Sequence, residues 1–416
     1  MNETTKTPWD IEGKWSVSPY GWSEEVRKEF PLMRKKIAIR DDTFREGDDC
    51  VGYRVSIKDK IELLRLSVEM GIEEIDIGGP SMHKHQYDLA AALRESGIKV
   101  RKTGRFFGNN TKDYKRDVDL CMESGSDNLR VVLMFLNEKA VLEQLKTLPA
   151  IFDYVHSQYK TTVSWAISDT PRAPMDLIRK VYREGVAAGG DKAGINDTFG
   201  IATPGVMRYL THEIRSIIPE EMPLKAHCHN TFGLATANTL ACAEGGGTEL
   251  DCCINGYGDE AGNASLEEVA ASLEALYGVD TGLNLGLLNK YSKMAIEKGQ
   301  IPIQPHKAIV GENAFLRPML IWSGIDMAKE SWMLHEPLSP SLVGTKSNVV
   351  FGPEQSLDDA PIEKKFKELG IPCTPVKIVQ AREAVERMLL EERQITVRRK
   401  YVTELEFEDI LKKMPR

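Results

Sequence analysis

The chain has 416 residues, 42% of them hydrophobic and 28% charged, and its formal net charge is −8. Because one core rarely grows past roughly 250–300 residues, we expect a large domain and a smaller one. No segment approaches the run of about 20 apolar residues that a membrane helix needs, and the acidic balance argues against a nucleic-acid surface. We therefore expect neither a membrane nor a nucleic acid as a partner.

The first 33 residues show no clear hydrophobic period. Met1–Trp15 is polar and lacks the basic-then-apolar order of a secretory signal. Three tryptophans, Trp9, Trp15 and Trp22, favour packing against a neighbour over exposure to water. We predict an N-terminal arm over residues 1–33 and a homodimeric chain.

From residue 34 onward, short apolar runs rich in β-branched residues alternate with amphipathic helical patterns. Eight such runs are Lys36–Arg40, Ile72–Ile77, Ile98–Lys102, Asn128–Phe135, Thr161–Ile167, Ala193–Asn196, Pro223–His227 and Leu250–Asn255. Eight strands alternating with helices over about 250 residues indicate a (β/α)8 barrel. We predict an α/β fold, with a TIM barrel over residues 34–288. A doubly wound open sheet is the alternative, but it usually has fewer strands, and no GxGxxG follows the first run.

Beyond the barrel the pattern changes. Glycines and prolines interrupt residues 336–352, and charged helices follow near Ile362–Leu369, Val376–Glu391 and Leu405–Lys413. We predict a mainly helical C-terminal extension over residues 289–416.

The cysteines are scattered along the chain. There are seven, an odd number, and no CxxC occurs among them, so the sequence suggests neither a disulfide framework nor a zinc ribbon. Free thiols in a reducing compartment, and hence a cytoplasmic location, are the expectation.

The segment Ala226–Asn238, AHCHNTFGLATAN, carries the sharpest chemical signal. His227 and His229 alternate with period two, so on a strand both imidazoles point to the same face. In a barrel the carboxyl ends of the strands form the mouth of the active site. A lone HxH is more often a packed or surface pair, but two neutral imidazoles at that mouth are good ligands for a divalent metal.

Acidic residues follow the first two strands. Arg45, Glu46 and Gly47 come where the first strand reaches the mouth, and Asp76 ends the second. Taken alone, this acidic segment also fits a solvated loop. A carboxylate from the first strand and the HxH from the seventh would together form a nitrogen–oxygen site with room for substrate oxygens.

Polar side chains also follow most other strands. The glycine-rich segment after the eighth strand, INGYGDEAGNASLEEV, contains Asn263, whose amide oxygen could reach a metal. The remaining strand-end residues are Arg105, Asp169, Arg172 and Thr198, and His83 with His85 lies after the second strand. Each alone also fits a helix cap or a surface residue.

Four segments in order, DDTFREG, INDTFGIATP, AHCHNTFGLATAN and INGYGDEAGNASLEEV, resemble the DRE-TIM metallolyase family. This family of TIM barrels contains isopropylmalate, homocitrate, citramalate and Re-type citrate synthases, hydroxymethylglutaryl-CoA lyase and 4-hydroxy-2-oxovalerate aldolase. The resemblance covers Ile37 to about Gly278. VGENAF and HEPLSPSLVG further along resemble the C-terminal subdomains of the synthases, which the lyases usually lack.

The resemblance assigns roles residue by residue. Arg45 matches the catalytic arginine, and Asp76 matches an acidic residue on the second strand. The matching metal ligands are Glu46, His227, His229 and Asn263. The positions that match the substrate pocket are Arg105, Asp169, Arg172 and Thr198.

Several positions depart from the family pattern. The family has Asp after the catalytic arginine and Glu on the second strand, whereas this chain has Glu46 and Asp76, an exchange that conserves charge. A GER triplet is replaced by Gly258-Asp259-Glu260, and the proton-transfer histidine of the synthases by Asp326. Either Asp326 or another residue, such as His83 or His85, is then the expected base. His83 is also a candidate for substrate binding.

The resemblance implies a Claisen-type condensation of an acyl-CoA, such as acetyl-CoA, with a 2-oxo acid, dependent on Mg²⁺, Mn²⁺ or Zn²⁺. A metal-dependent lyase or aldolase is the alternative, although the lyase's catalytic cysteine is absent from Tyr257–Gly262. A third possibility is a non-catalytic barrel that serves as a binding subunit.

Overall fold

The computed structural model describes residues 7–108, 113–318, 337–351, 359–391 and 402–414. They fall into two units. The first contains Val17–Ile303 with Met1–Ile11 and Ala308–Val310, and the second contains Gly311–Arg416 with Glu12–Ser16 and Gln304–Lys307. No helix among the described residues is both long and apolar enough to cross a bilayer.

The first unit is built on a closed parallel barrel, as predicted. Its strands, in chain order, are β3 (Ala38–Asp41), β4 (Glu74–Asp76), β5 (Arg101–Phe107), β6 (Asn128–Leu133), β7 (Val163–Ile167), β8 (Lys192–Asp197), β9 (Leu224–Cys228) and β10 (Glu249–Cys252). The ring closes where β10 pairs with β3, with Asp251 in register with Arg40. Every predicted strand overlaps an observed one, and the TIM-barrel prediction is confirmed.

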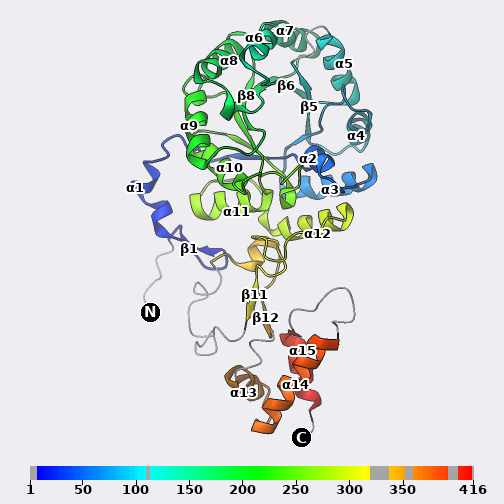
Figure 1. Ribbon diagram of the computed structural model, residues 1–416, viewed down its shortest axis with the longest axis vertical. Helices are drawn as coiled ribbons and strands as arrows, with labels where there is room; N and C mark the ends of the chain where they lie inside the picture. Colours follow the sequence, from blue (N-terminus) through cyan, green and yellow to red (C-terminus); the bar gives the residue numbers. More distant parts are fainter. Residues whose placement is uncertain (1–6, 109–112, 319–336, 352–358, 392–401, 415–416) are drawn as a thin grey trace. The chain divides into compact units, whose positions relative to one another are not determined.

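Helices surround the strands on the outside (Figure 1). They are α3 (Ile57–Met70), α4 (Lys84–Glu95), α5 (Tyr114–Ser124), α6 (Glu138–Leu145), α7 (Leu148–Tyr159), α8 (Met175–Ala187), α9 (Pro204–Arg215), α10 (Ala235–Glu244) and α11 (Leu266–Tyr277). The unit also contains β1 (Asp10–Ile11), α1 (Glu24–Arg27), α2 (Thr43–Asp49), α12 (Leu288–Gly299) and the 3-10 turns η1 (Pro19–Trp22), η2 (Thr170–Arg172), η3 (Ile254–Gly256) and η4 (Leu285–Leu287).

Local signals set the helix ends. Ser56 caps α3 by accepting a hydrogen bond from the Asp59 amide, and Gly71 ends the helix with a left-handed φ of 115°. Between these ends, α3 buries Leu63 and Leu64 completely. The amphipathic pattern predicted between the strands therefore marks the face of the helix that packs on the barrel.

The third strand differs most from its predicted position. We placed it at Ile98–Lys102, whereas β5 spans Arg101–Phe107. Gly97 adopts a left-handed φ of 71° in the turn after α4, and the apolar residues Ile98 and Val100 lie in the loop that follows. Thr103 faces the barrel interior, where it hydrogen-bonds Arg40 and Glu74. Polar residues on this inner face concealed the strand.

Charged side chains fill much of the barrel interior, which bulky branched residues usually fill. Arg40 contacts Asp251 at 2.6 Å and Glu74 at 2.9 Å, and Lys225 contacts Asp251 at 2.7 Å. Arg130 lies 3.4 Å from the same Asp251 carboxylate. An unpaired buried charge costs several kcal/mol of stability. Each of these charged side chains is therefore stable inside the barrel only because its oppositely charged partners are present.

Helix α12 belongs to the first unit, although we ended the barrel at residue 288. Tyr291 on this helix donates a 2.5 Å hydrogen bond to the buried Asp41 carboxylate on β3, which also accepts from Ser67. The domain boundaries at residues 33 and 288 remain predictions.

We expect Tyr291→Phe to lower the free energy of unfolding by about 1–3 kcal/mol, because it leaves a buried carboxylate oxygen without one donor. Urea denaturation measures the change. Tyr20→Phe is the control, since Tyr20 is 73% exposed and should lose less than about 0.5 kcal/mol. Equal stability of Tyr291→Phe and the unchanged chain would contradict the prediction.

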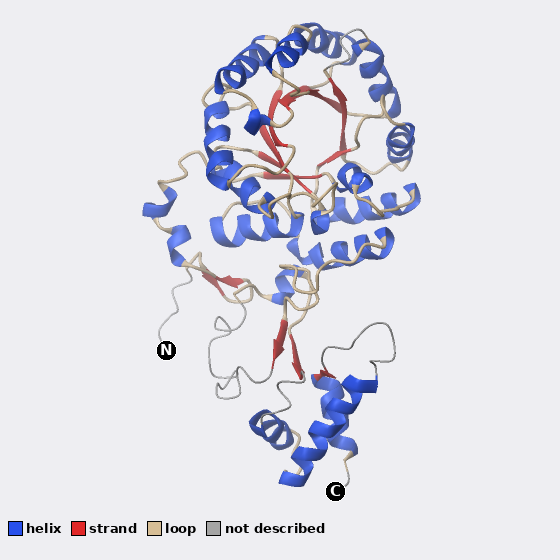
Figure 2. Ribbon diagram, in the orientation of Figure 1, coloured by secondary structure: helices blue, strands red, loops and turns tan. Residues whose placement is uncertain are grey.

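The second unit contains mostly helices, as predicted, and a small sheet that was not predicted. Its helices are α13 (Asp359–Glu368), α14 (Pro375–Glu391) and α15 (Glu404–Lys413), and its other elements are β2 (Trp15–Ser16), β11 (Leu316–Pro318), η7 (Pro340–Val343), β12 (Asn348–Phe351) and β13 (Val402–Thr403). The helices enclose a core that includes Phe366, Ala381 and Phe407. Figure 2 distinguishes these helices from the strands of the barrel.

Candidate metal centre

The two histidines of the HxH segment meet at the carboxyl end of β9. His227 lies within the strand and His229 just beyond it, and both are 7% exposed. Their Nε2 atoms are 3.1 Å apart. The period-two spacing thus places both imidazoles on the same side of the strand, as expected.

Glu46 faces these imidazoles from α2, which follows β3 directly. Its Oε1 lies 3.1 Å from Nε2 of His227 and 4.0 Å from Nε2 of His229. Burial alone would raise the pKa of Glu46, but the Arg45 guanidinium and both imidazoles hold it well below the usual range. Both carboxylate oxygens are buried, and Oε1 forms an ion pair with the Arg45 guanidinium.

Asn263 approaches from the loop after β10 and forms a backbone bridge with His229. Its Nδ2 contacts the Tyr257 carbonyl at 3.4 Å, whereas its buried Oδ1 has no hydrogen-bond partner in the described chain. Ligand atoms of Glu46, His227 and His229 lie within 4.8 Å of one another. Two imidazole nitrogens, a buried carboxylate and an amide oxygen without a partner are a ligand set that fits a divalent cation.

The Nδ1 atom of each imidazole faces carboxylates. For His227 these are Asp251 at 3.3 Å and Asp42 at 3.5 Å, and for His229 it is Asp259 at 2.9 Å. Burial would lower the pKa of His227, but its carboxylate neighbours raise it to about 10. A cation bound at Nε2 must therefore displace a proton.

Arg45 lies beside this cluster and is surrounded by acidic groups. It pairs with Glu46 and lies 3.8 Å from Asp76 through Nε, and 3.7 Å from Asp42. Burial would raise the pKa of Asp76, but Arg130 and Arg45 lower it to about 2. The predicted catalytic residues Arg45 and Asp76 thus belong to the same network of ion pairs as Glu46, one of the candidate metal ligands.

The other predicted residues occupy several places. Burial and the nearby Arg45 lower the pKa of Arg105, which Asp76 opposes, and its buried Nε has no hydrogen-bond partner among the described residues. Asp169 forms a separate group with Arg172 at 2.9 Å, and its amide donates to the Thr198 hydroxyl.

No described contact joins the remaining candidates to the metal cluster. His83 lies at the start of α4, 5.6 Å from His85 between ring centroids. Asp326 lies outside the described residues. The identity of the base therefore stays a prediction.

Three carboxylates beside the imidazoles were not predicted as site residues, namely Asp42, Asp251 and Asp259. Asp251 had one signal in the sequence, a single charge within an apolar strand. Its partners come from strands that are distant along the chain and become neighbours when the barrel closes.

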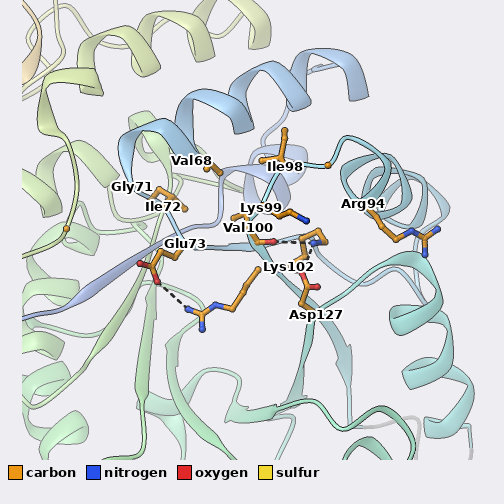
Figure 3. Close-up of a pocket in the computed structure, with 13 residues that line it drawn as sticks. Val68, Gly71, Ile72, Glu73, Arg94, Ile98, Lys99, Val100, Lys102 and Asp127 are labelled. Carbon is orange, nitrogen blue, oxygen red and sulfur yellow. Dashed lines mark hydrogen bonds and ion pairs between the residues drawn. The ribbon is translucent and has the colours of Figure 1, made fainter.

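A pocket lies at the opposite, amino-terminal ends of β4 and β5. Figure 3 shows its lining, which includes Glu73, Arg94, Lys102 and Asp127. Lys102 contacts Asp127 at 2.6 Å, and the Arg94 guanidinium donates to the Glu123 carbonyl. These cations are already partnered, and the pocket is remote from the strand ends that carry the metal cluster.

A closed barrel with a cluster of imidazoles and a carboxylate at the carboxyl ends of its strands is typical of metal-binding TIM barrels. A family model described as HMGL-like matches residues 36–295, and the chain belongs to this family of DRE-TIM proteins. The resemblance seen in the motifs is therefore confirmed. Enzymes of this family depend on a divalent metal ion.

Known relatives match well beyond the barrel. The chain is 32% identical to 2-isopropylmalate synthase of Methanocaldococcus jannaschii over 81% of its own length and 64% of the relative's. It is 29% identical to the homocitrate synthase AksA of Methanopyrus kandleri, over 95% of this chain and 96% of that one. The chain thus spans less than two thirds of the isopropylmalate synthase but nearly all of AksA.

A solved structure shares the barrel. The HMG-CoA lyase of Bacillus subtilis superposes with a TM-score of 0.56 at 20% identity, over 65% of this chain and 96% of the lyase. At that identity the likeness concerns the fold alone.

Proposed function

We propose that the chain catalyses the condensation of an acyl-CoA, in the first place acetyl-CoA, with a 2-oxo acid. The carbon nucleophile of the acyl group adds to the oxo carbon, and hydrolysis of the thioester then releases a 2-hydroxy diacid and free CoA. The observation that carries this proposal is the similarity to 2-isopropylmalate and homocitrate synthases over most of the chain, including the segment after the barrel.

Glu46, His227, His229 and Asn263 would hold the divalent metal, with Mg²⁺, Mn²⁺ or Zn²⁺ suited to two imidazoles and oxygen ligands. A bound metal supplies a Lewis acid that polarises the oxo group. Arg45 provides a fixed positive charge for the alkoxide that develops on that oxygen. Asp76 and Asp42 hold the guanidinium in place through the contacts described above.

The remaining roles extend this proposal. Arg105, Asp169, Arg172, Thr198 and His83 would line the substrate pocket, and Asp326 or His83 would remove the proton from the acyl-CoA. We further propose a homodimer in the cytoplasm. The free cysteines among the described residues are compatible with a reducing compartment.

Release of free thiol from acetyl-CoA tests the activity. The metal-loaded chain is incubated with single 2-oxo acids, and thiol release that requires both the oxo acid and the metal is the expected result. Cleavage of hydroxyacyl-CoA or hydroxy-oxo acids, without thiol release for any oxo acid, would identify a lyase or aldolase instead.

A further inference from the structure

The two imidazoles of the candidate metal centre are supported in different ways. Nδ1 of His227 faces Asp251, a fully buried carboxylate that also contacts Arg40 and Lys225. These partners lie on the strands of the barrel, so the orientation of His227 is fixed by the rigid interior of the fold.

His229 lies just beyond the end of β9 and contacts a residue of a loop. Its Nδ1 is 2.9 Å from Oδ1 of Asp259, whose side chain is 49% exposed although Oδ1 itself is buried. An ionised carboxylate can only accept a hydrogen bond. A proton on Nδ1 is therefore favoured, and the lone pair of Nε2 is left to face Glu46.

The loop that carries Asp259 has a tightly defined backbone. The Gly262 amide donates to the Asp259 carbonyl at 2.7 Å, and the Asn263 amide donates to the Gly256 carbonyl at 3.0 Å. Gly262 has a left-handed φ of 87°, and a Cβ there would lie 2.0 Å from the Gly256 carbonyl oxygen. This backbone therefore fixes Asp259 against His229, and Asn263 at the end of the loop forms a backbone bridge with the same histidine.

We propose that Asp259 is a positioning residue that holds His229 with Nδ1 protonated and Nε2 directed at the metal, so that the loop after β10 sets the affinity of the centre. This inference rests on the proposed metal site. It assigns to Asp259 a role that differs from substrate contact and from direct ligation.

The test compares Asp259→Asn with Glu260→Gln in the full chain. Both changes replace a carboxylate by its amide and remove one negative charge from the same loop. Glu260 is exposed and reaches Thr231 at 3.5 Å, not an imidazole. Mn²⁺ binding to the metal-free protein is measured by titration calorimetry, and Co²⁺ binding by visible absorption.

Asp259→Asn should weaken Mn²⁺ binding about 10–100-fold, as the loss of a partner behind a ligating histidine does, and should change the Co²⁺ spectrum. Glu260→Gln should stay within about twofold, as a surface change does. Thermal unfolding of the metal-free proteins should agree, which separates positioning from loss of fold.

Two results would overturn the inference. One is Mn²⁺ affinity in Asp259→Asn equal to that of the unchanged chain, and the other is equal weakening by Glu260→Gln, which would indicate charge alone. If the unchanged chain binds no metal, the proposed metal site fails and the inference with it. If the unchanged chain binds metal and Asp259→Asn binds it equally well, only the role of Asp259 fails.

Discussion

Replacing Glu46 by glutamine should remove divalent-metal binding and, with it, condensation activity. The change keeps the size of a side chain that is fully buried but takes away the negative charge that faces the two Nε2 atoms. We expect the Mn²⁺ affinity to fall by more than about 100-fold, beyond the cost of losing an outer partner of a ligand. Calorimetry of the metal-free chain measures the loss.

Glu69→Gln on α3 is the matched control for Glu46→Gln, because it makes the same chemical change on an exposed side chain. It should bind metal as the unchanged chain does. Normal Mn²⁺ affinity in Glu46→Gln would show that the metal, if any, binds elsewhere.

Substitution of Arg45 should also remove activity, but unlike Glu46→Gln it should leave metal binding intact. The guanidinium is close to Glu46, so its charge opposes a nearby cation, and its removal should leave metal binding as tight or tighter. The same charge is proposed to stabilise the developing alkoxide, and its loss should lower kcat about 10²–10³-fold. Arg45→Met tests the charge.

Arg45→Lys tests the geometry, since lysine keeps the charge but not the planar guanidinium that reaches several carboxylates. Arg179→Met is the control, because Arg179 forms a partly exposed pair with Glu213 on the outer helices. Thermal unfolding shows whether Arg45→Met remains folded. Unchanged kcat in a folded Arg45→Met chain would contradict the assigned role.

The fold was largely predictable because alternation of apolar runs and amphipathic helices is a local property of the sequence. Strand β5 is the exception, because its predicted position was displaced. In β5, Thr103 and Arg105 belong to an inner face that is polar, so hydrophobicity did not mark the strand. The charged residues inside the barrel are hard to interpret from the sequence for the same reason. Arg40 and Lys225 interrupt apolar strands, and their acidic partners are not known before the barrel is formed.

The grouping of the three candidate ligands could be predicted from the sequence, whereas the residues around them could not. The HxH spacing and the place of Glu46 after the first strand suffice to bring Glu46, His227 and His229 together. The approach of Asp251 and Asp259 to the imidazoles depends on the closure of the ring and on the path of a glycine-rich loop. Neither is encoded in the spacing of a motif.

Closure of β10 onto β3 would give a metal held by Glu46 and Asn263 a second role, that of joining the first and last strands of the barrel. Glu46 follows the first strand of the ring, whereas Asn263 follows the last. A ligand that binds only the folded chain stabilises it by about 2.7 kcal/mol at a concentration 100 times its dissociation constant. In this protein the binding energy would stabilise the contact between two segments that are more than two hundred residues apart in the chain. These segments become neighbours only when the barrel closes.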